Sequence, residues 1–388
     1  MILRLPKFLE SLQTSNDESN TTKVQVSLAR LLSTKLVRVT GAAVVLLLLF
    51  GFALRNLDGL DRIRPKPHVL QPPPANGDVN WSRFAYTQYV TDTSYLCNSV
   101  MLFEILNRLG SKPDRLMMYP SAWSADDSDS LEGSLLRKAR DEYGVKLMPI
   151  EVQRKASNDP TWAESFTKLL AFNQTQYDRV LSLDSDSTVL QHMDELFLIP
   201  KVPVAMPRAY WLNPKDRVLS SQLVLLQPSE FEFERVQKGI EAAGRSDYDM
   251  EIVNTLYRDS ALILPHRPYD LITGEFRSKK HNPYLGNDVE PWDPDAVLRE
   301  AKFLHFSDWP VPKPWISNPS LMDQHKPACD VDETTREENC RGQELWLGFY
   351  SDFATRRKRI CDMDVRRRKR GVEDGRGTVN PSPYEPIF

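Results

Sequence analysis

Apolar, strand-like runs alternate with amphipathic helical segments from residue 83 onwards, and this alternation constrains the fold more than any other feature. Helical spacing of apolar residues over 93–109, followed by Gly110, is typical of a helix and its end. The expected strands are 83–91, 115–119, 146–150, the run around Val180, 223–226 and 261–264, and the expected helices are 93–109, 130–143, 162–172 and 230–243. Such alternation predicts an α/β, Rossmann-like domain whose mixed, mainly parallel central sheet is covered on both faces.

Two carboxylates follow the most buried of the expected strands. The run 180–183 is short and apolar, which is typical of a strand covered on both faces. Asp184 and Asp186 lie two residues apart, so an extended chain projects them to the same side. Ligands of parallel sheets bind at the carboxyl ends of strands, and two like charges there are costly unless a cation neutralises them. The pair therefore predicts a divalent metal that carries a phosphorylated ligand.

One segment, 39–54, is uncharged and apolar, although the 388 residues together carry a net charge of only −3. Its sixteen residues would span about 24 Å as a helix, slightly less than the roughly 27 Å hydrocarbon layer of the endoplasmic reticulum. Flanking basic residues and a following Pro-rich region favour a single-pass anchor over a buried soluble helix. The long segment before it disfavours a cleaved signal peptide. The small net charge gives no reason to expect a nucleic-acid partner.

The anchor divides the chain into parts of different composition. Basic residues on both sides of it leave the orientation open by the positive-inside rule alone. We expect a cytosolic N-terminus, because we interpret the rest of the chain as a lumenal catalytic domain. The expected parts are a cytosolic tail (1–38), the transmembrane anchor (39–54), a Pro-rich stem (55–80), a catalytic domain (81–316) and a Cys-containing, basic extension (317–388).

Four cysteines are present, and three of them lie in the polar C-terminal segment. A lumenal setting permits disulfides, and the spacing fits no zinc pattern with nearby histidines. We expect one disulfide among Cys329, Cys340 and Cys361, with the pairing left open. The alternative is three unpaired thiols.

Among six histidines, His305 has the most suggestive surroundings. It follows an apolar pair and precedes a Pro-rich loop that carries Lys313. An imidazole ligand and a cation for phosphate in one loop would suit a nucleotide-diphosphate leaving group. Taken alone, His305 would be a structural histidine, but the carboxylate pair favours the ligand role.

The stretch 166–197 reads FTKLLAFNQTQYDRVLSLDSDSTVLQHMDELF. It contains a T-K-L helix, a strand that begins after Tyr-Asp, a D-x-D and a D-E-L-F turn, in that order. This pattern resembles glycosyltransferase family 8, the glycogenin-like nucleotide-sugar transferases, and within it the fungal type II membrane N-acetylglucosaminyltransferases. The resemblance covers about 81–315 and implies a GT-A type fold.

The resemblance also implies roles for individual residues. The metal ligands would be Asp184, Asp186 and His305, with Mn²⁺ or Mg²⁺ as the cation. The diphosphate contacts would be Lys168 and Lys313, the uridine contacts Thr91 and Tyr95, and the residue near the donor sugar Asp249. For Tyr95 the alternative is ordinary helix packing, and for Lys168 a solvated helix lysine.

Two departures from the family pattern affect the residues expected near the donor sugar. Ser220-Ser221-Gln222 stands where the family carries Asn-Ser-Gly, and Asp249-Met250 stands where it carries Asp-Gln. Glu251 is a possible substitute for the missing Gln. The loop between His305 and Lys313 is longer than the family's, which affects the assignment of that lysine.

The resemblance implies a retaining glycosyltransferase that moves a sugar from a UDP-sugar to a glycan acceptor in the Golgi lumen. The favoured donor sugar is N-acetylglucosamine. A first alternative is a UDP-glucose or UDP-galactose transferase of the same fold. A second is a catalytically inactive, membrane-bound carbohydrate-binding or scaffold protein. The oligomeric state is not predicted.

Overall fold

The computed structural model describes residues 79–155, 164–331 and 336–367. The expected cytosolic tail, the anchor 39–54 and all but the end of the stem lie outside these residues, so they stay predictions. A search of the described helices finds none that is both long and apolar enough to cross a membrane.

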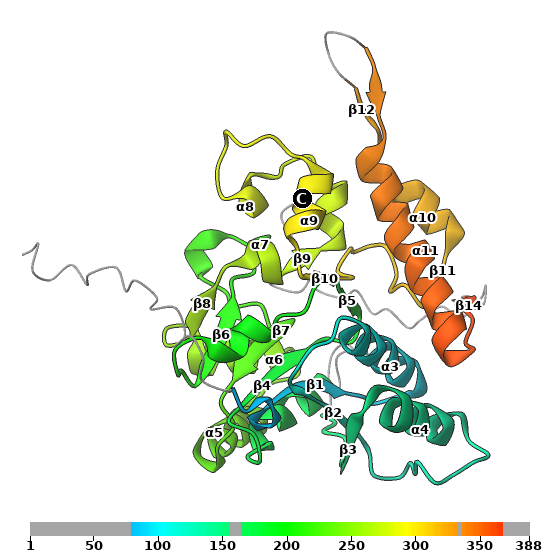
Figure 1. Cartoon of the computed structure of the whole chain (residues 1–388). Helices are drawn as coiled ribbons and strands as arrows, with labels where there is room; N and C mark the ends of the chain where they lie inside the picture. The colour runs from blue at the N-terminus through cyan, green and yellow to red at the C-terminus, as the bar shows by residue number, and fades with distance from the viewer. Residues whose placement is uncertain (1–78, 156–163, 332–335, 368–388) are drawn as a thin grey trace, which may run out of the picture. The chain divides into compact units, whose positions relative to one another are not determined.

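A mixed sheet forms the centre of the described part, as Figure 1 shows. Its seven strands follow the order β3-β2-β1-β4-β7-β6-β8. They are β1 (Phe84–Tyr89), β2 (Asp114–Pro120), β3 (Val145–Ile150), β4 (Arg179–Leu183), β6 (Val204–Pro207), β7 (Leu223–Leu226) and β8 (Leu262–Leu264). Strands β3, β2, β1 and β4 run parallel, β7 is antiparallel to both its neighbours, and β8 is parallel to β6. The predicted mixed, mainly parallel sheet is confirmed.

Helices cover both faces of this sheet. On one face lie α3 (Thr93–Arg108) and α4 (Leu131–Tyr143), and on the other η3 (Ser165–Asn173), α5 (Glu230–Ala242) and α6 (Asp249–Tyr257). Along β4, Leu181 packs in the first core and Val180 in the second, because successive side chains of a strand point to opposite faces. The prediction of a strand buried on both faces is confirmed.

Helix ends follow the local sequence signals. Asp92 caps α3, since its side chain accepts hydrogen bonds from the backbone N–H groups of Ser94 and Tyr95. Ser130 caps α4, and Gly144 ends it in the left-handed conformation at φ 63°. The segment expected as a helix over 162–172 contains a 3-10 helix, η3, in its described part. Lys168 is a residue of η3.

A second, three-stranded sheet lies at the carboxyl ends of the parallel strands. It has the order β5-β10-β9, formed by β5 (Ser187–Val189), β10 (Phe303–His305) and β9 (Leu271–Ile272). Strand β5 begins directly after the Asp184–Asp186 turn and pairs antiparallel with β10, with Ser187 opposite His305. This pairing brings His305 beside Asp186, 119 positions away in the chain.

The remaining elements lie in the connections and near the C-terminus. The 3-10 helices are η1 (Trp81–Arg83), η4 (Asp194–Leu198), η5 (Pro214–Asp216) and η6 (Thr273–Arg277). The short α-helices are α7 (His266–Tyr269), α8 (Asn282–Leu285), α9 (Pro294–Glu300) and α10 (Pro319–His325). Two small sheets pair β11 (Ile316–Ser317) with β14 (Arg366–Arg367) and β12 (Asp330–Val331) with β13 (Glu338–Asn339).

The C-terminal segment contributes a long helix, α11 (Arg341–Cys361), to the core. Trp346 and Phe353 are buried on it, and the guanidinium of Arg357, also buried, donates to Asn98 Oδ1 at 2.8 Å. The expected domain boundary at residue 316 stays a prediction, but the sequence did not indicate that α11 packs against α3.

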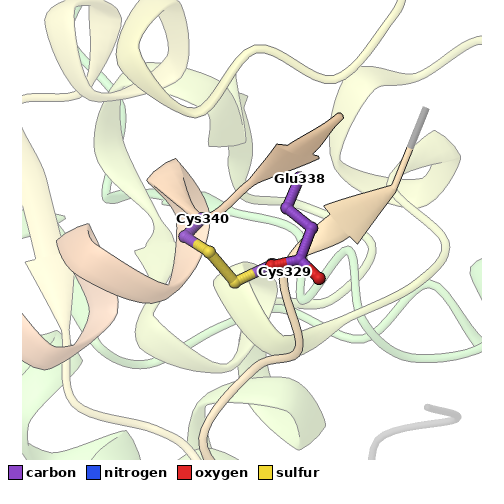
Figure 2. Close-up of side chains that lie close together, drawn as sticks. All are labelled: Cys329, Glu338 and Cys340. Carbon is purple, nitrogen blue, oxygen red and sulfur yellow. A yellow bond between two sulfur atoms is a disulfide. The ribbon is translucent and has the colours of Figure 1, made fainter. Parts of the chain in front are cut away.

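Two disulfides are present. Cys329 pairs with Cys340, which confirms one disulfide among the three C-terminal cysteines and excludes three free thiols. Cys361 pairs with Cys97 across 264 residues and ties α11 to α3, a partner that sequence spacing alone could not indicate. Glu338 lies beside the Cys329–Cys340 bridge, as Figure 2 shows. Because the two sulfurs are bonded to each other, neither is a thiolate that could bind a metal there.

Candidate active site

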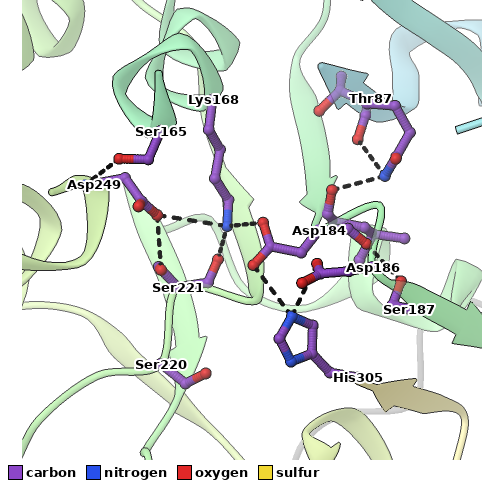
Figure 3. A network of polar contacts seen from close by, with 12 residues as sticks. Thr87, Ser165, Lys168, Asp184, Asp186, Ser187, Ser220, Ser221, Asp249 and His305 are labelled. Atoms are coloured by element: carbon purple, nitrogen blue, oxygen red, sulfur yellow. Dashed lines mark hydrogen bonds and ion pairs between the residues drawn. The ribbon is translucent and has the colours of Figure 1, made fainter. Parts of the chain in front are cut away.

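Asp184, Asp186 and His305 converge at the junction of the two sheets (Figure 3). The backbone N–H of Asp184 donates to the carbonyl of Gln222 at 3.0 Å, and that of Phe306 donates to the carbonyl of Asp186 at 2.9 Å. These bonds and the β5–β10 pairing bring one ligand atom of each side chain within 4.8 Å of the others. His305 Nε2 lies 3.0 Å from Asp186 Oδ1 and 3.7 Å from Asp184 Oδ2.

The chemistry of this trio fits a divalent cation. Two carboxylate oxygens and one imidazole nitrogen suit Mn²⁺, and Mg²⁺ with further oxygen ligands. Asp186 and His305 are buried, and two carboxylates so close together in a poorly solvated place call for positive charge. Burial raises the pKa of Asp184 to about 6, although Lys168 opposes this. Burial acts in the same direction on Asp186, but His305 and Lys313 outweigh it and hold its pKa below the usual range.

Lys168 reaches the carboxylates from η3. Its side chain is only 2% exposed, so the alternative of a solvated helix lysine is wrong. Its ammonium donates to Asp184 Oδ1 at 2.6 Å and to the carbonyl of Ser221, and it lies 3.7 Å from Asp249 Oδ2. Burial disfavours the charge, but the carboxylates, Asp184 first, raise the pKa of Lys168 overall. The lysine therefore stays cationic.

Asp249 is the first residue of α6 and belongs to the same network (Figure 3). Its Oδ2 accepts from the Ser221 hydroxyl at 2.8 Å, and its backbone N–H donates to Ser165 Oγ at 3.3 Å. Asp249 is as buried as Asp186, so it belongs to the buried part of the site. Glu251 instead accepts from the backbone N–H of Tyr248 at the start of α6, so it serves the helix end.

Lys313 reaches the cluster from the loop that follows β10. Its ammonium lies 2.5 Å from Asp186 Oδ2 and donates to the carbonyl of Phe306 at 2.9 Å. The longer loop that separates it from His305 therefore still returns the lysine to the carboxylate pair.

The two residues expected to contact uridine lie at the start of α3. Tyr95 packs edge-on against Trp315, with ring centroids 5.3 Å apart. The helix packing expected as the alternative role of Tyr95 is therefore present. Burial, and next the charge of Asp186, raise the pKa of Tyr95, which places its hydroxyl in the field of the cluster. Thr91 lies partly exposed in the connection from β1 to α3, at the same edge of the sheet.

Three residues in this neighbourhood were not predicted as site residues. Tyr89 ends β1, and burial together with the charges of Asp184 and Asp249 raises its pKa. Its place at the carboxyl end of a parallel strand is a signal that could have found it. Ser221, noted only as a departure from the family pattern, contacts both Lys168 and Asp249.

Asp270 is the third unpredicted residue. It precedes β9, is fully buried, and accepts from the Ser220 hydroxyl at 3.1 Å. Its second carboxylate oxygen has no hydrogen-bond partner among the described residues, and burial raises its pKa well above the usual range. Nothing in the local sequence distinguishes it from an exposed aspartate.

No protein-family model matches the chain. Individual fungal proteins are similar to it. A Gibberella zeae protein named glucose N-acetyltransferase 1 is 60% identical over 290 residues, which cover 73% of this chain and 64% of that protein. An Aspergillus fumigatus protein of the same name is 49% identical over 301 residues, which cover 73% and 78%. A Saccharomyces cerevisiae protein of that name is 26% identical over 412 residues, which cover 74% and 83%.

Solved glycosyltransferase structures are also similar, at low sequence identity. The bifunctional WbbM enzyme is 14% identical with a TM-score of 0.47, covering 73% of this chain and 50% of that one. The galactosyltransferase LgtC with donor and acceptor sugar analogs is 10% identical with a TM-score of 0.43, covering 69% and 95%. At TM-scores below 0.5, these likenesses support no conclusion about this chain.

The fungal relatives decide the family. The chain spans slightly less than two thirds of the Gibberella protein but 78% of the Aspergillus protein, and the identity to the latter is 49%. The resemblance to fungal transferases that the sequence indicated is therefore confirmed, and so is the prediction of a transferase. This chain belongs to the family of fungal proteins named glucose N-acetyltransferase 1.

Proposed function

We propose that this protein is a metal-dependent retaining glycosyltransferase of the GT-A type that moves N-acetylglucosamine from a UDP-sugar to a glycan acceptor. The observation that carries the proposal is one arrangement of charges. Asp184, Asp186 and His305 converge within 4.8 Å, while the Lys168 ammonium contacts Asp184 and the Lys313 ammonium contacts Asp186. A cation and two ammonium groups match the charge of a nucleotide diphosphate.

The donor side follows from these contacts. Asp184, Asp186 and His305 would hold Mn²⁺ or Mg²⁺, which would neutralise charge on the departing diphosphate when bound. Lys168 is kept cationic by the carboxylates around it, and Lys313 presents its ammonium at Asp186. Both lysines are therefore available to stabilise the negative charge that grows on the leaving group.

The transfer exchanges one bond for another. The bond between the anomeric carbon and the diphosphate oxygen breaks, and the electron pair leaves with UDP. The acceptor hydroxyl forms the new glycosidic bond on the same face and gives its proton to the departing diphosphate. Asp249 is buried and engaged with Ser221, so we assign it to shaping the floor of the sugar site rather than to attack on the anomeric carbon.

The names of the relatives support the choice of sugar. Each name mentions glucose, an N-acetyl group and a transferase activity. Read literally, the name describes acetyl transfer to glucose, but the metal-binding and lysine cluster suits a diphosphate-linked donor better. UDP-glucose and UDP-galactose remain alternative donors, and an inactive carbohydrate-binding protein remains the non-enzymatic alternative.

A Golgi location, with the catalytic domain in the lumen and 39–54 as a type II anchor, belongs to the same proposal. The two disulfides support an oxidising compartment, because cytosolic thiols are kept reduced. Protease protection of sealed Golgi vesicles should leave the catalytic part intact until detergent is added. Digestion without detergent would contradict the lumenal assignment.

A donor panel tests the function. The detergent-solubilised full chain is incubated with UDP-N-acetylglucosamine, UDP-glucose, UDP-galactose and acetyl-coenzyme A, each with Mn²⁺ or with EDTA. We expect Mn²⁺-dependent UDP release from UDP-N-acetylglucosamine above that from the other sugars, and no use of the acetyl donor. A preference for another UDP-sugar would replace the donor. Failure of the chain to bind UDP in calorimetry with Mn²⁺ would favour the inactive alternative.

A further inference from the structure

Trp309 stands out among the tryptophans of the described residues. Its side chain is 70% exposed, whereas the others are buried or half-buried. Those others are Trp81, Trp123, Trp211, Trp292, Trp315 and Trp346. Single exposed apolar residues are common on protein surfaces, so exposure alone means little. Two further observations make Trp309 a candidate binding residue: its place in the loop, and the hydrogen bonds that hold the backbone around it.

The position follows from the two ends of its loop. His305 lies 3.0 Å from Asp186 Oδ1, and Lys313 lies 2.5 Å from Asp186 Oδ2. Trp309 is the midpoint of this loop, four residues from each end. Four residues of extended chain reach about 14 Å at most, so the Trp309 backbone lies within that distance of both ends of the loop, which contact Asp186.

The support comes from the residue before it. Asp308 is buried and accepts hydrogen bonds from Trp346 Nε1 at 2.6 Å, from the Tyr350 hydroxyl at 3.2 Å and from the Arg277 guanidinium. Arg277 also donates to the backbone carbonyl of Trp309 at 3.0 Å. The backbone around the indole is thus held by α11 and η6 while the ring itself faces solvent. Because the backbone is already ordered, ligand binding would have to order only the side chain.

We infer that Trp309 is a stacking platform for a sugar ring of the glycan acceptor, an inference that rests on the proposed function. A pyranose ring presents a face of C–H groups and a rim of hydroxyls, and indole presents an apolar face and one N–H donor. Trp309 is the only exposed apolar residue of the loop 305–313, since Val311 is buried and Pro310 and Pro312 are half-buried. A protein partner would need a much larger contact area than one ring. A single sugar ring fits what is exposed.

Kinetics of three variants test the inference in the full chain. Trp309→Ala should raise the acceptor KM about tenfold, equivalent to ~1.4 kcal/mol, while hydrolysis of UDP-N-acetylglucosamine without acceptor stays unchanged. Trp309→Phe should retain most of the acceptor affinity. Phe231→Ala is the matched control, because Phe231 is 68% exposed at the start of α5 and makes no contact with the loop 305–313 among the interactions of the described residues. It should change neither quantity.

Two results would overturn the platform: an unchanged acceptor KM in Trp309→Ala, or an equal loss of acceptor-free hydrolysis. A binding experiment separates this failure from failure of the proposed function. Mannotriose, and separately cellotriose, is titrated while tryptophan fluorescence is recorded. A change in the wild type that is absent in Trp309→Phe supports the platform even if no UDP-sugar is turned over. No change with either trisaccharide in the wild type overturns it.

Discussion

The two walls of the candidate site are held in place by different means. The sheet wall, consisting of Lys168, Asp184 and Asp249, is carried by β4 and the helices that pack on the central sheet. The loop wall, residues 305–313, is carried by β10 and by contacts of Asp308 with α11 and η6. The first is supported by the middle of the fold, and the second by a helix from the end of the chain.

This difference suggests that the two walls have different functions. The sheet wall holds a buried lysine among carboxylates, and such a network tolerates little change because each lost partner leaves a charge unpaired. In the middle of the loop wall, Asp308 is buried and the next residue, Trp309, is exposed, so the loop combines rigid support with a surface that faces solvent. We expect changes in the sheet wall, and at His305 and Lys313 where the loop wall begins and ends, to act on donor chemistry. Changes at Asp308 and Trp309 in the middle of the loop should act on stability and acceptor binding.

The largest effect should come from the sheet wall. Asp184→Ala removes one proposed metal ligand and the main partner of Lys168, so we expect transfer to fall at least about a hundredfold. Calorimetry should also show loss of Mn²⁺-dependent UDP binding. Asp141→Ala is the control, because Asp141 is exposed at the end of α4 and pairs only with Arg140 among the described ion pairs. Normal Mn²⁺-dependent transfer by Asp184→Ala would refute the metal assignment.

The two walls also differ in how far the sequence could predict them. The strand before Asp184, the helix ends and the mixed sheet could be predicted because their signals lie within a few residues of one another in the sequence. The convergence of Lys168 with Asp184 was indicated by a family pattern within one 32-residue stretch. The hydrogen bond from Trp346 to Asp308 and the disulfide from Cys361 to Cys97 depend on packing between distant segments. No short-range pattern encodes such contacts, so α11 was missed as part of the site's support.

The second prediction concerns the support of α11. Closing a loop restricts the unfolded chain more when the loop is longer. By the chain-entropy estimate, removing Cys97–Cys361, separated by 264 residues, should cost ~5 kcal/mol, and removing Cys329–Cys340, separated by 11, ~3 kcal/mol. Paired Cys→Ser variants, compared by urea unfolding, measure the difference. Equal losses would show that α11 is held by its other contacts and that the loop wall does not depend on the bridge.

The third prediction concerns Asp308, the buried residue beside Trp309 in the loop wall. Asp308→Ala leaves the Arg277 guanidinium and the Trp346 N–H without their acceptor, so the free energy of unfolding should fall by about 3 kcal/mol. Asp308→Asn keeps an acceptor and should recover part of the loss. If Asp308→Ala unfolds like the wild type, the loop is held by something other than this network, and the position of Trp309 needs another explanation.

The smallest effect should come from Asp270, which lies between the walls and belongs to neither. Burial raises the pKa of this carboxyl well above its ordinary value of 3.8, so the folded protein keeps a proton that the unfolded chain releases. The folded state therefore binds more protons, and the contribution of Asp270 to stability is full below about pH 4 and is lost as pH rises.

Within that window the loss approaches ~1.4 kcal/mol per pH unit for one group. Asp270→Asn cannot titrate but can still accept from Ser220, so its stability should fall less between pH 5 and pH 7 than that of the wild type. Urea unfolding at the two pH values measures the difference between the proteins, in which the titration of other buried carboxyls cancels. Identical pH dependence would mean that Asp270 is ionised in the folded protein, and that its second oxygen has a cationic partner which the described residues do not supply.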